Sequence, residues 1–191
     1  MSEPLILGFD TSAAHCAAAL LCGDRVLVVR AEDMGRGQAE RLMPLLEEVL
    51  AEGGVRWRDL ARIGVGIGPG NFTGIRISVA AARGLALSLG IPAIGISTLE
   101  AIRAGHERGT PCVPAPRDQG YVQRAGHMPD LVAMADIADA VLPPAPARLA
   151  ERIARLATLA PGEGPPPAPL YVRPADAAPA RDAPPEILDD A

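Results

Sequence analysis

The feature that most constrains this sequence is the stretch over residues 62–89, R-I-G-V-G-I-G-P-G-N-F-T-G-I-R-I-S-V-A-A-A-R-G-L-A-L-S-L. Its first part alternates isoleucine and valine with glycine, which predicts a buried strand packed closely on both faces. Residues 68–71 predict a sharp turn, and a helical pattern begins at Thr73 or Gly74. A strand, a glycine loop and a helix N-terminus in this order direct free backbone N–H groups at an anion.

Two familiar nucleotide-binding loops do not fit this stretch. A P-loop requires a lysine, and the chain has none, because all 18 basic residues are arginine. The dinucleotide fingerprint G-x-G-x-x-G also fails, since its third glycine would fall on Pro69, Asn71 or Thr73. An alternative stays open for Gly64, Gly66 and Gly68. In this alternative, these residues are small only so that helices can pack on the strand.

Asp10 is the other residue that indicates chemistry. It ends an apolar run and precedes Thr11 and Ser12. An acid at a strand end beside a glycine loop is typical of a site that orders a metal-bound water near phosphate. The alternative is a turn-capping aspartate. The candidate phosphate or nucleotide site therefore consists of Asp10, Thr11, Ser12, Gly68, Gly70, Asn71, Thr73 and Gly74.

Length, charge and cysteine content limit the classes of protein. The 191 residues suffice for one domain or two small lobes. Most of the net charge of −5 lies in the last sixteen residues, so the body is near neutral and unsuited to gripping nucleic acid unaided. Three cysteines without a C-x-x-C motif indicate reduced thiols and no zinc site. No apolar run reaches the roughly 20 residues of a membrane span, so we expect a cytoplasmic protein.

The first hundred residues predict the order β-β-β-α-β-α-β-α. Three strands form an antiparallel meander, and two more return through helical crossovers and are therefore parallel. A proline at position 44 must begin or kink the first helix. The expected strands are 5–9, 15–21, 25–31, 63–67 and 93–96, and the expected helices lie within 35–52, from 73 onward, and from an N-cap at Thr98 to about 104.

The remainder of the chain has a weaker pattern. We predict a hairpin with strands at 112–116 and 121–124, helices over 131–142 and 147–159, and a Pro/Gly-rich linker over 161–169. A short hydrophobic clip at 170–174 follows, and the acidic end is expected to be disordered. The predicted domains are an N-terminal lobe at 1–104, a reduced second lobe with the clip at 105–175, and a tail at 176–191.

Two helices have apolar or small faces. Such a face usually lies on its own sheet, but a neighbouring pair can also present a surface to a partner. A ridge of small residues permits close approach of another helix. The candidate partner interface consists of Leu42, Leu46, Val49, Leu50, Arg76, Ala81 and Gly84.

Four motifs resemble the bacterial TsaB family, also called YeaZ. They are F-D-T-S at 9–12, G-x-G-P-G-N-F-T-G-I-R-I-S at 66–78, G-I-S-T-L-E-A-I at 95–102 and P-L-Y-V-R-P-A-D at 169–176. The resemblance implies an actin-like ATPase fold (ASKHA, RNase H-like), with a mixed five-stranded sheet, flanking helices and a reduced second lobe. Residues 114–121 depart from the Asp-Ala-Arg-Arg-type segment usual in the family, so the nucleotide cleft is expected to be incomplete and the phosphate site vestigial.

The resemblance also implies a function. Members of this family are non-catalytic paralogues of TsaD, which places threonylcarbamoyl on adenosine beside the tRNA anticodon. They pair with TsaD through the first two helices, are joined by the ATPase-like TsaE, and form homodimers when alone. We therefore expect a scaffold subunit with no catalytic residue, no metal, no tightly bound cofactor, no membrane and at most indirect contact with tRNA, with ATP or ADP and Mg²⁺ at a subunit junction.

Two enzymatic alternatives belong to other classes. An ATP-dependent phosphotransferase or ATPase of the same fold would need an adenosine loop in the second lobe, where residues 124–168 contain few glycines. A metallopeptidase would need metal ligands and a general base, and His15, His106 and His127 are scattered, with no pair at H-x-x-x-H spacing.

Overall fold

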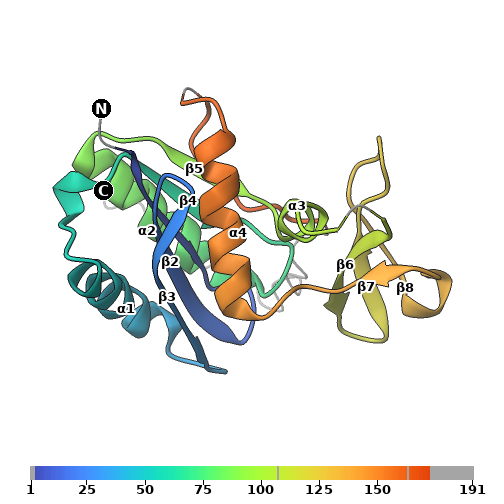
Figure 1. Cartoon of the computed structure of the whole chain (residues 1–191). Helices are drawn as coiled ribbons and strands as arrows, with labels where there is room; N and C mark the ends of the chain where they lie inside the picture. The colour runs from blue at the N-terminus through green and yellow to red at the C-terminus, as the bar shows by residue number, and fades with distance from the viewer. Residues whose placement is uncertain (1–2, 107, 163, 173–191) are drawn as a thin grey trace, which may run out of the picture.

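The computed structural model describes residues 3–106, 108–162 and 164–172. Its larger sheet has five strands in the order β3-β2-β1-β4-β5 (Figure 1). The first three are antiparallel neighbours, whereas β4 and β5 run parallel to β1. The meander and the parallel crossovers predicted from the sequence are confirmed. The strands are β1 (Leu5–Asp10), β2 (His15–Cys22), β3 (Arg25–Asp33), β4 (Arg62–Gly66) and β5 (Ala93–Ile96).

Helices cover both faces of this sheet. On one face, α1 (Gln38–Glu52) packs its leucines against Leu7, Phe9 and Val65, with α2 (Phe72–Leu89) beside it. On the other face lies α4 (Pro146–Leu159), whose alanines contact Ile6 and alternate residues of β2. The period of two along β1 therefore divides its side chains between two apolar layers. The proline inside α1 lies in its second turn.

Two strand glycines allow α4 to approach the sheet. A Cβ added at Gly8 would lie 2.6 Å from the Ala154 Cβ, and one added at Gly64 would lie 2.9 Å from the Ala157 Cβ. The packing interpretation of Gly64 is therefore correct. The sequence analysis assigned residues 105–175, which include α4, to the second lobe. For α4 this assignment is wrong, because the helix completes the core of the first sheet.

The second sheet has four strands in the order β8-β7-β6-β9. The predicted hairpin is confirmed as β6 (Thr110–Ala115) and β7 (Gln119–Val122), joined by a three-residue turn in which Arg117 and Asp118 both have positive φ. The other strands are β8 (Asp130–Ala133) and β9 (Ala140–Val141).

The helix predicted over residues 131–142 is wrong. Residues 130–133 pair with β7 instead, with Leu131 opposite Tyr121, and a 3-10 turn at Met134–Asp136 leads on to β9. The physical reason is tertiary: β7 has an open edge whose backbone groups need partners, and pairing outweighs a local helical pattern.

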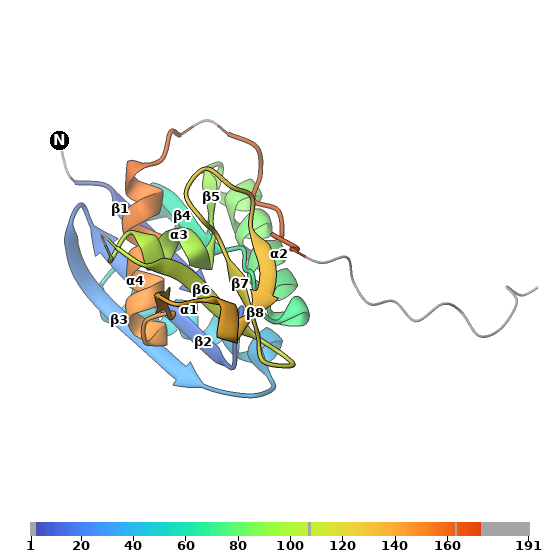
Figure 2. The same ribbon diagram turned by 90° about the vertical axis from the view of Figure 1, so that its right-hand side faces the viewer.

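The short helix α3 (Thr98–Arg103) follows β5. Its N-cap is Ser97, one residue before the predicted Thr98, because Ser97 and Glu100 form a capping box. The segment after α4 returns past β5 and α2 (Figure 2), where the Leu170 N–H donates to the Ile67 carbonyl at 2.8 Å. The predicted clip thus adjoins the strand β4. Its last two residues and the acidic tail lie outside the described residues.

One helix meets the length and composition criteria for a membrane span. It is α2, with 18 residues of which 28% are buried. A single helix of this kind is weak support for a membrane span, and α2 is interrupted by Arg76 and Arg83.

Candidate functional site

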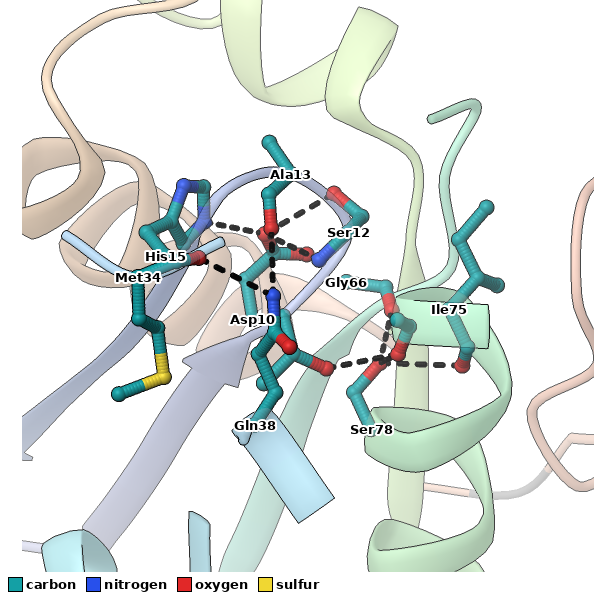
Figure 3. Close-up of polar contacts among 11 residues, drawn as sticks. Asp10, Ser12, Ala13, His15, Met34, Gln38, Gly66, Ile75 and Ser78 are labelled. Atoms are coloured by element: carbon teal, nitrogen blue, oxygen red, sulfur yellow. Dashed lines mark hydrogen bonds and ion pairs between the residues drawn. The ribbon is translucent and has the colours of Figure 1, made fainter. Parts of the chain in front are cut away.

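Asp10 lies at the carboxyl end of β1 and is fully buried. Its Oδ2 accepts hydrogen bonds from the Ser12 N–H at 3.0 Å and the Ser12 hydroxyl at 2.9 Å (Figure 3). The Nε2 of His15, which is 6% exposed, lies 2.7 Å from the same oxygen. Asp10 is therefore a turn-capping residue, as the alternative interpretation states, and also half of a buried pair with His15 that the sequence interpretation missed.

The second carboxylate oxygen of Asp10 has a different environment. Oδ1 is buried and has no hydrogen-bond partner among the described residues. A Cβ on Gly66 would overlap this oxygen. Gly66 is therefore small because the carboxylate needs the space, and helix packing is not the reason.

The glycine loop and the end of β1 fit together closely. Added Cβ atoms at Gly70 and Gly74 would overlap the carbonyl oxygens of Ser12 and Thr11. The Thr11 hydroxyl donates to the Gly74 carbonyl at 2.7 Å, and the Asn71 N–H donates to the Ser12 carbonyl at 2.6 Å. The structure thus brings Asp10, Thr11, Ser12, Gly70, Asn71 and Gly74 together as predicted. The buried Gly68 begins the loop, and Thr73 lies exposed in the first turn of α2.

Two N–H groups of this loop form hydrogen bonds within the protein. The Asn71 side chain accepts from the Gly74 N–H at 2.8 Å and so caps α2. The Asn71 N–H is paired with Ser12, as described above. Further along, the Ser78 hydroxyl lies 3.1 Å from the Gly66 and Ile75 carbonyls (Figure 3). The expectation that the loop directs all its N–H groups at an anion is thus too broad, because two of them bond internally.

A cavity of about 680 Å³ opens between this loop and the second sheet. Ser12, His15 and Asn71 line one side, while Tyr121 and several prolines of the second sheet and the start of α4 line the other. Thr98 also lines it, and its hydroxyl is buried without a hydrogen-bond partner in the described structure. The cavity joins apolar walls with a few polar groups, which is the usual character of a small-ligand site.

The structure corrects the predicted partner interface. Leu42, Leu46, Val49 and Leu50 are at most 3% exposed and belong to the core under the sheet. They are unavailable to a partner, because the apolar stripe of α1 faces its own sheet. On α2, Ala81 is half-buried, while Arg76 and Gly84 are exposed.

No metal centre is evident in the described ranges, where no group of three or more His, Cys, Asp or Glu residues is placed to hold an ion. His106 and His127 lie at the exposed surface, far in sequence from the buried His15. Cys16 and Cys112 are buried free thiols, and burial raises the pKa of both, that of Cys16 to about 11.

Comparison with known proteins identifies the family. The family model described as TsaD: tRNA N6-adenosine threonylcarbamoyltransferase matches residues 29–163. The TsaB protein of Buchnera aphidicola from Schizaphis graminum is 39% identical over 95 residues, covering 50% of this chain and 45% of that protein. The TsaB protein of Escherichia coli K12 is 36% identical over 100 residues, covering 52% and 43%. The chain thus spans less than half the length of these curated relatives.

A solved structure shows a similar fold. YeaZ from Pseudomonas aeruginosa superposes with a TM-score of 0.69 at 26% identity, covering 82% of this chain and 92% of that one. A second structure from the same organism, described as an uncharacterized protein with similarity to peptidase YEAZ, has a TM-score of 0.72 at 24% identity, covering 90% and 100%. The mixed sheet flanked by helices is the actin-like architecture, and the chain belongs to the TsaB (YeaZ) family.

Proposed function

We propose that this chain is a non-catalytic partner subunit in tRNA threonylcarbamoyladenosine biosynthesis. In this proposal it acts in the cytoplasm and pairs with a TsaD-like catalytic paralogue and a TsaE-like ATPase. The names of the relatives support the pathway. The observation that supports a partner role comes from this chain itself and concerns the outer face of α2.

Gly84 is the residue that carries the argument. It lies inside α2, where a glycine costs about 1 kcal/mol relative to alanine. A Cβ added there would meet no atom of the described residues within 4 Å. Packing among those residues therefore gives no reason for a glycine at this position. Close approach of a helix from another molecule does give one, because small residues let two helix axes come together.

The surroundings of Gly84 fit a docking face. Ala80, one turn earlier, is exposed, and Leu87, one turn later, is 88% exposed. These three residues follow the i, i+4, i+7 spacing of one helix face. The same face on a second copy would be self-complementary about a two-fold axis, which accounts for the expected homodimer in the absence of the paralogue. The proposed docking face thus consists of Ala80, Gly84 and Leu87 on α2.

The burial of Asp10 favours a partner role over ATP hydrolysis by this chain. Its carboxylate is 0% exposed and is held by Ser12 and His15. A carboxylate that orders a metal-bound water must be reachable by that water. We therefore do not propose the ATPase alternative. Any ATP or ADP with Mg²⁺ would enter at the junction with the paralogue, and tRNA would contact this chain at most indirectly.

The test uses two exposed leucines near helix ends. Leu87→Glu changes the proposed docking face, whereas Leu159→Glu changes a residue that is 81% exposed on α4, on the opposite face of the sheet. Size-exclusion chromatography with light scattering would follow the chain alone and with the TsaD-like paralogue of the same organism. We expect the native chain and Leu159→Glu to form the complex and Leu87→Glu to lose it. Complex formation by Leu87→Glu, or by none of the three, would contradict the proposal.

A further inference from the structure

An apolar groove lies at the C-terminal end of α2, away from the glycine loop. This α2–β5 groove has a volume of about 850 Å³ and is lined on one side by Arg83 and Leu87 of α2. Residues 91–94, which lead into β5, line a second side, and Pro166 and Pro167 line a third. Leu87 is 88% exposed, so its side chain is left uncovered by the described residues.

The proline side of the groove is fixed by contacts within the chain. The segment after α4, which passes β5 and α2 (Figure 2), is held at its start by the Arg62 guanidinium, which donates to the Ala160 carbonyl. It is held at its end by the Leu170 N–H, which donates to a carbonyl next to β4 at 2.8 Å. A Cβ added at Gly95 would lie 3.2 Å from the Pro167 Cβ, so the prolines pack directly on β5. A groove that is already formed reduces the ordering cost of binding.

The charge at this groove is positive among the described residues. Arg83 is the charged residue among those that line it, and Arg83 forms no ion pair within the part of the chain that the structure describes. Glu163 lies outside the described residues, next to two lining glycines. We therefore assign the binding mainly to apolar contact, and to Arg83 the preference for a ligand that also carries negative charge.

The chain itself contains a segment of this character. Residues 173–191 lie beyond the described part of the chain, and within them only Ile187 and Leu188 have large apolar side chains. The surrounding residues 186–190 read E-I-L-D-D, which places acids on both sides of the apolar pair. An apolar pair flanked by acids is complementary to an apolar groove that carries an arginine.

This segment can reach the groove from the point where the described chain ends. Tyr171 stacks on Phe72 with ring centroids 5.0 Å apart, so the segment leaves from the N-terminal end of α2. The 18 residues of α2 make a helix about 27 Å long. The roughly 15 residues between Val172 and Ile187 can extend to about 50 Å. Such a tether also keeps the apolar pair near the groove at roughly millimolar effective concentration.

We propose that residues 186–190 bind in the α2–β5 groove of the same chain. Ile187 and Leu188 enter the groove beside Leu87, and the acids on either side face Arg83. The contact covers Leu87, which belongs to the proposed docking face, so the segment competes with the partner for this face. The competition rests on the proposed function, whereas the contact itself does not.

Backbone amide NMR spectra of the full chain would test the contact directly. Ile187→Asp with Leu188→Asp should shift the amide signals of Leu87 and of neighbouring groove residues, because the charged pair leaves the groove. Ala177→Asp with Ala178→Asp adds the same charge to the same segment and should leave these signals in place. Unchanged groove signals in the first variant overturn the proposal. Shifts that depend on protein concentration would assign the groove to a second copy, and they would also overturn it.

A fluorescent peptide of residues 183–191 would measure occupancy of the groove by anisotropy. We expect the peptide to bind the Ile187→Asp, Leu188→Asp chain at least about fivefold more tightly than the native chain, whose own segment fills the groove. Adding Leu87→Glu to the variant chain should weaken this binding, and adding Leu159→Glu, on α4, should not. Equal binding to the native and variant chains, or no effect of Leu87→Glu, would refute the contact.

The competition is tested separately with the TsaD-like paralogue. The Ile187→Asp, Leu188→Asp chain should form the complex at a concentration about fivefold lower than the native chain does. Complex formation at the same concentration by both chains would refute the competition. If neither chain binds the paralogue, the proposed function fails, and the spectra of the chain alone still decide whether the segment occupies the groove.

Discussion

The close packing of α4 on the sheet predicts that Gly8→Ala destabilises the protein. The new Cβ would lie 2.6 Å from the Ala154 Cβ and 2.7 Å from the Ala150 carbonyl oxygen. Favourable contact begins near ~3.5 Å, and two of the three nearest atoms belong to the helix backbone, which no side-chain rotation can move. The helix as a whole must therefore retreat by roughly 0.8 Å.

The magnitude follows from what α4 buries. Leu149 and Ile153 are buried, as are Ala150, Ala154 and Ala157, which together contribute roughly 5–8 kcal/mol of apolar burial. A gap of ~0.5–1 Å removes a quarter to a half of the dispersion in such contacts. We therefore expect Gly8→Ala to lower the free energy of unfolding by about 1–3 kcal/mol, which is also the usual range for overpacked cores.

The assay is urea unfolding followed by far-UV circular dichroism, with a thermal melt beside it. A loss of about 1–3 kcal/mol corresponds to a melting temperature lower by roughly 2–12 °C for a domain of this size. Gly84→Ala is the matched control, since it makes the same chemical change where a Cβ meets no atom within 4 Å in the part of the chain that the structure describes. It should raise the stability of the isolated chain by about 0.5–1 kcal/mol, because alanine favours the helix.

Equal stability of Gly8→Ala and the native chain would refute the reasoning. It would mean that α4 can shift on the sheet without loss, and that its assignment to the first core is wrong. A destabilising Gly84→Ala would likewise show that the outer face of α2 packs against something within the chain.

Three further predictions concern buried or paired groups. His15→Leu should cost about 3–5 kcal/mol in urea unfolding, because the buried Asp10 carboxylate loses its histidine partner and keeps only Ser12, and adding Asp10→Asn should recover part of the loss. Burial raises the pKa of Cys16 to about 11, so the unfolded thiol ionises first. Stability should therefore hold up to about pH 9 and fall by roughly 2–3 kcal/mol toward pH 11, and Cys16→Ala should remove this slope. A hydrogen bond from Arg41 lowers the pKa of Glu32. This contribution is present above the unfolded pKa of about 4.3 and is lost as pH falls, so thermal melts of Arg41→Gln between pH 3 and 6 should show a weaker acid dependence.

Much of the first lobe could be predicted because its signals are local. Period-two alternation, a Gly-Asp turn and helical stripes are set by residues a few positions apart, and they identified all five strands of the larger sheet. The β6–β7 hairpin was predicted for the same reason. The prediction of a helix at 131–142 is wrong because residues 130–133 pair with β7, and a helical pattern within the segment does not encode that strand pairing.

The candidate site was also predictable only in part. Its loop residues were found from composition, since small residues after a strand indicate a close backbone approach. The partner of each glycine was not predictable. Gly66 faces the Asp10 carboxylate, whereas Gly64 faces α4, although both follow the same repeat in the sequence. His15 was missed because a histidine at the start of an apolar strand carries no signal of what lies opposite its ring.

The sequence by itself determined the order of elements in the first lobe, the family, and the residues that surround the glycine loop. Only the tertiary structure decided which helix faces are exposed to solvent. The leucines of α1 proved to be core, while Gly84 and Leu87 of α2 proved exposed. It also brought Phe72, Tyr121 and Tyr171 around one cavity. The physical reason is that burial and proximity are properties of the whole packed chain, to which residues distant in sequence contribute as much as neighbours.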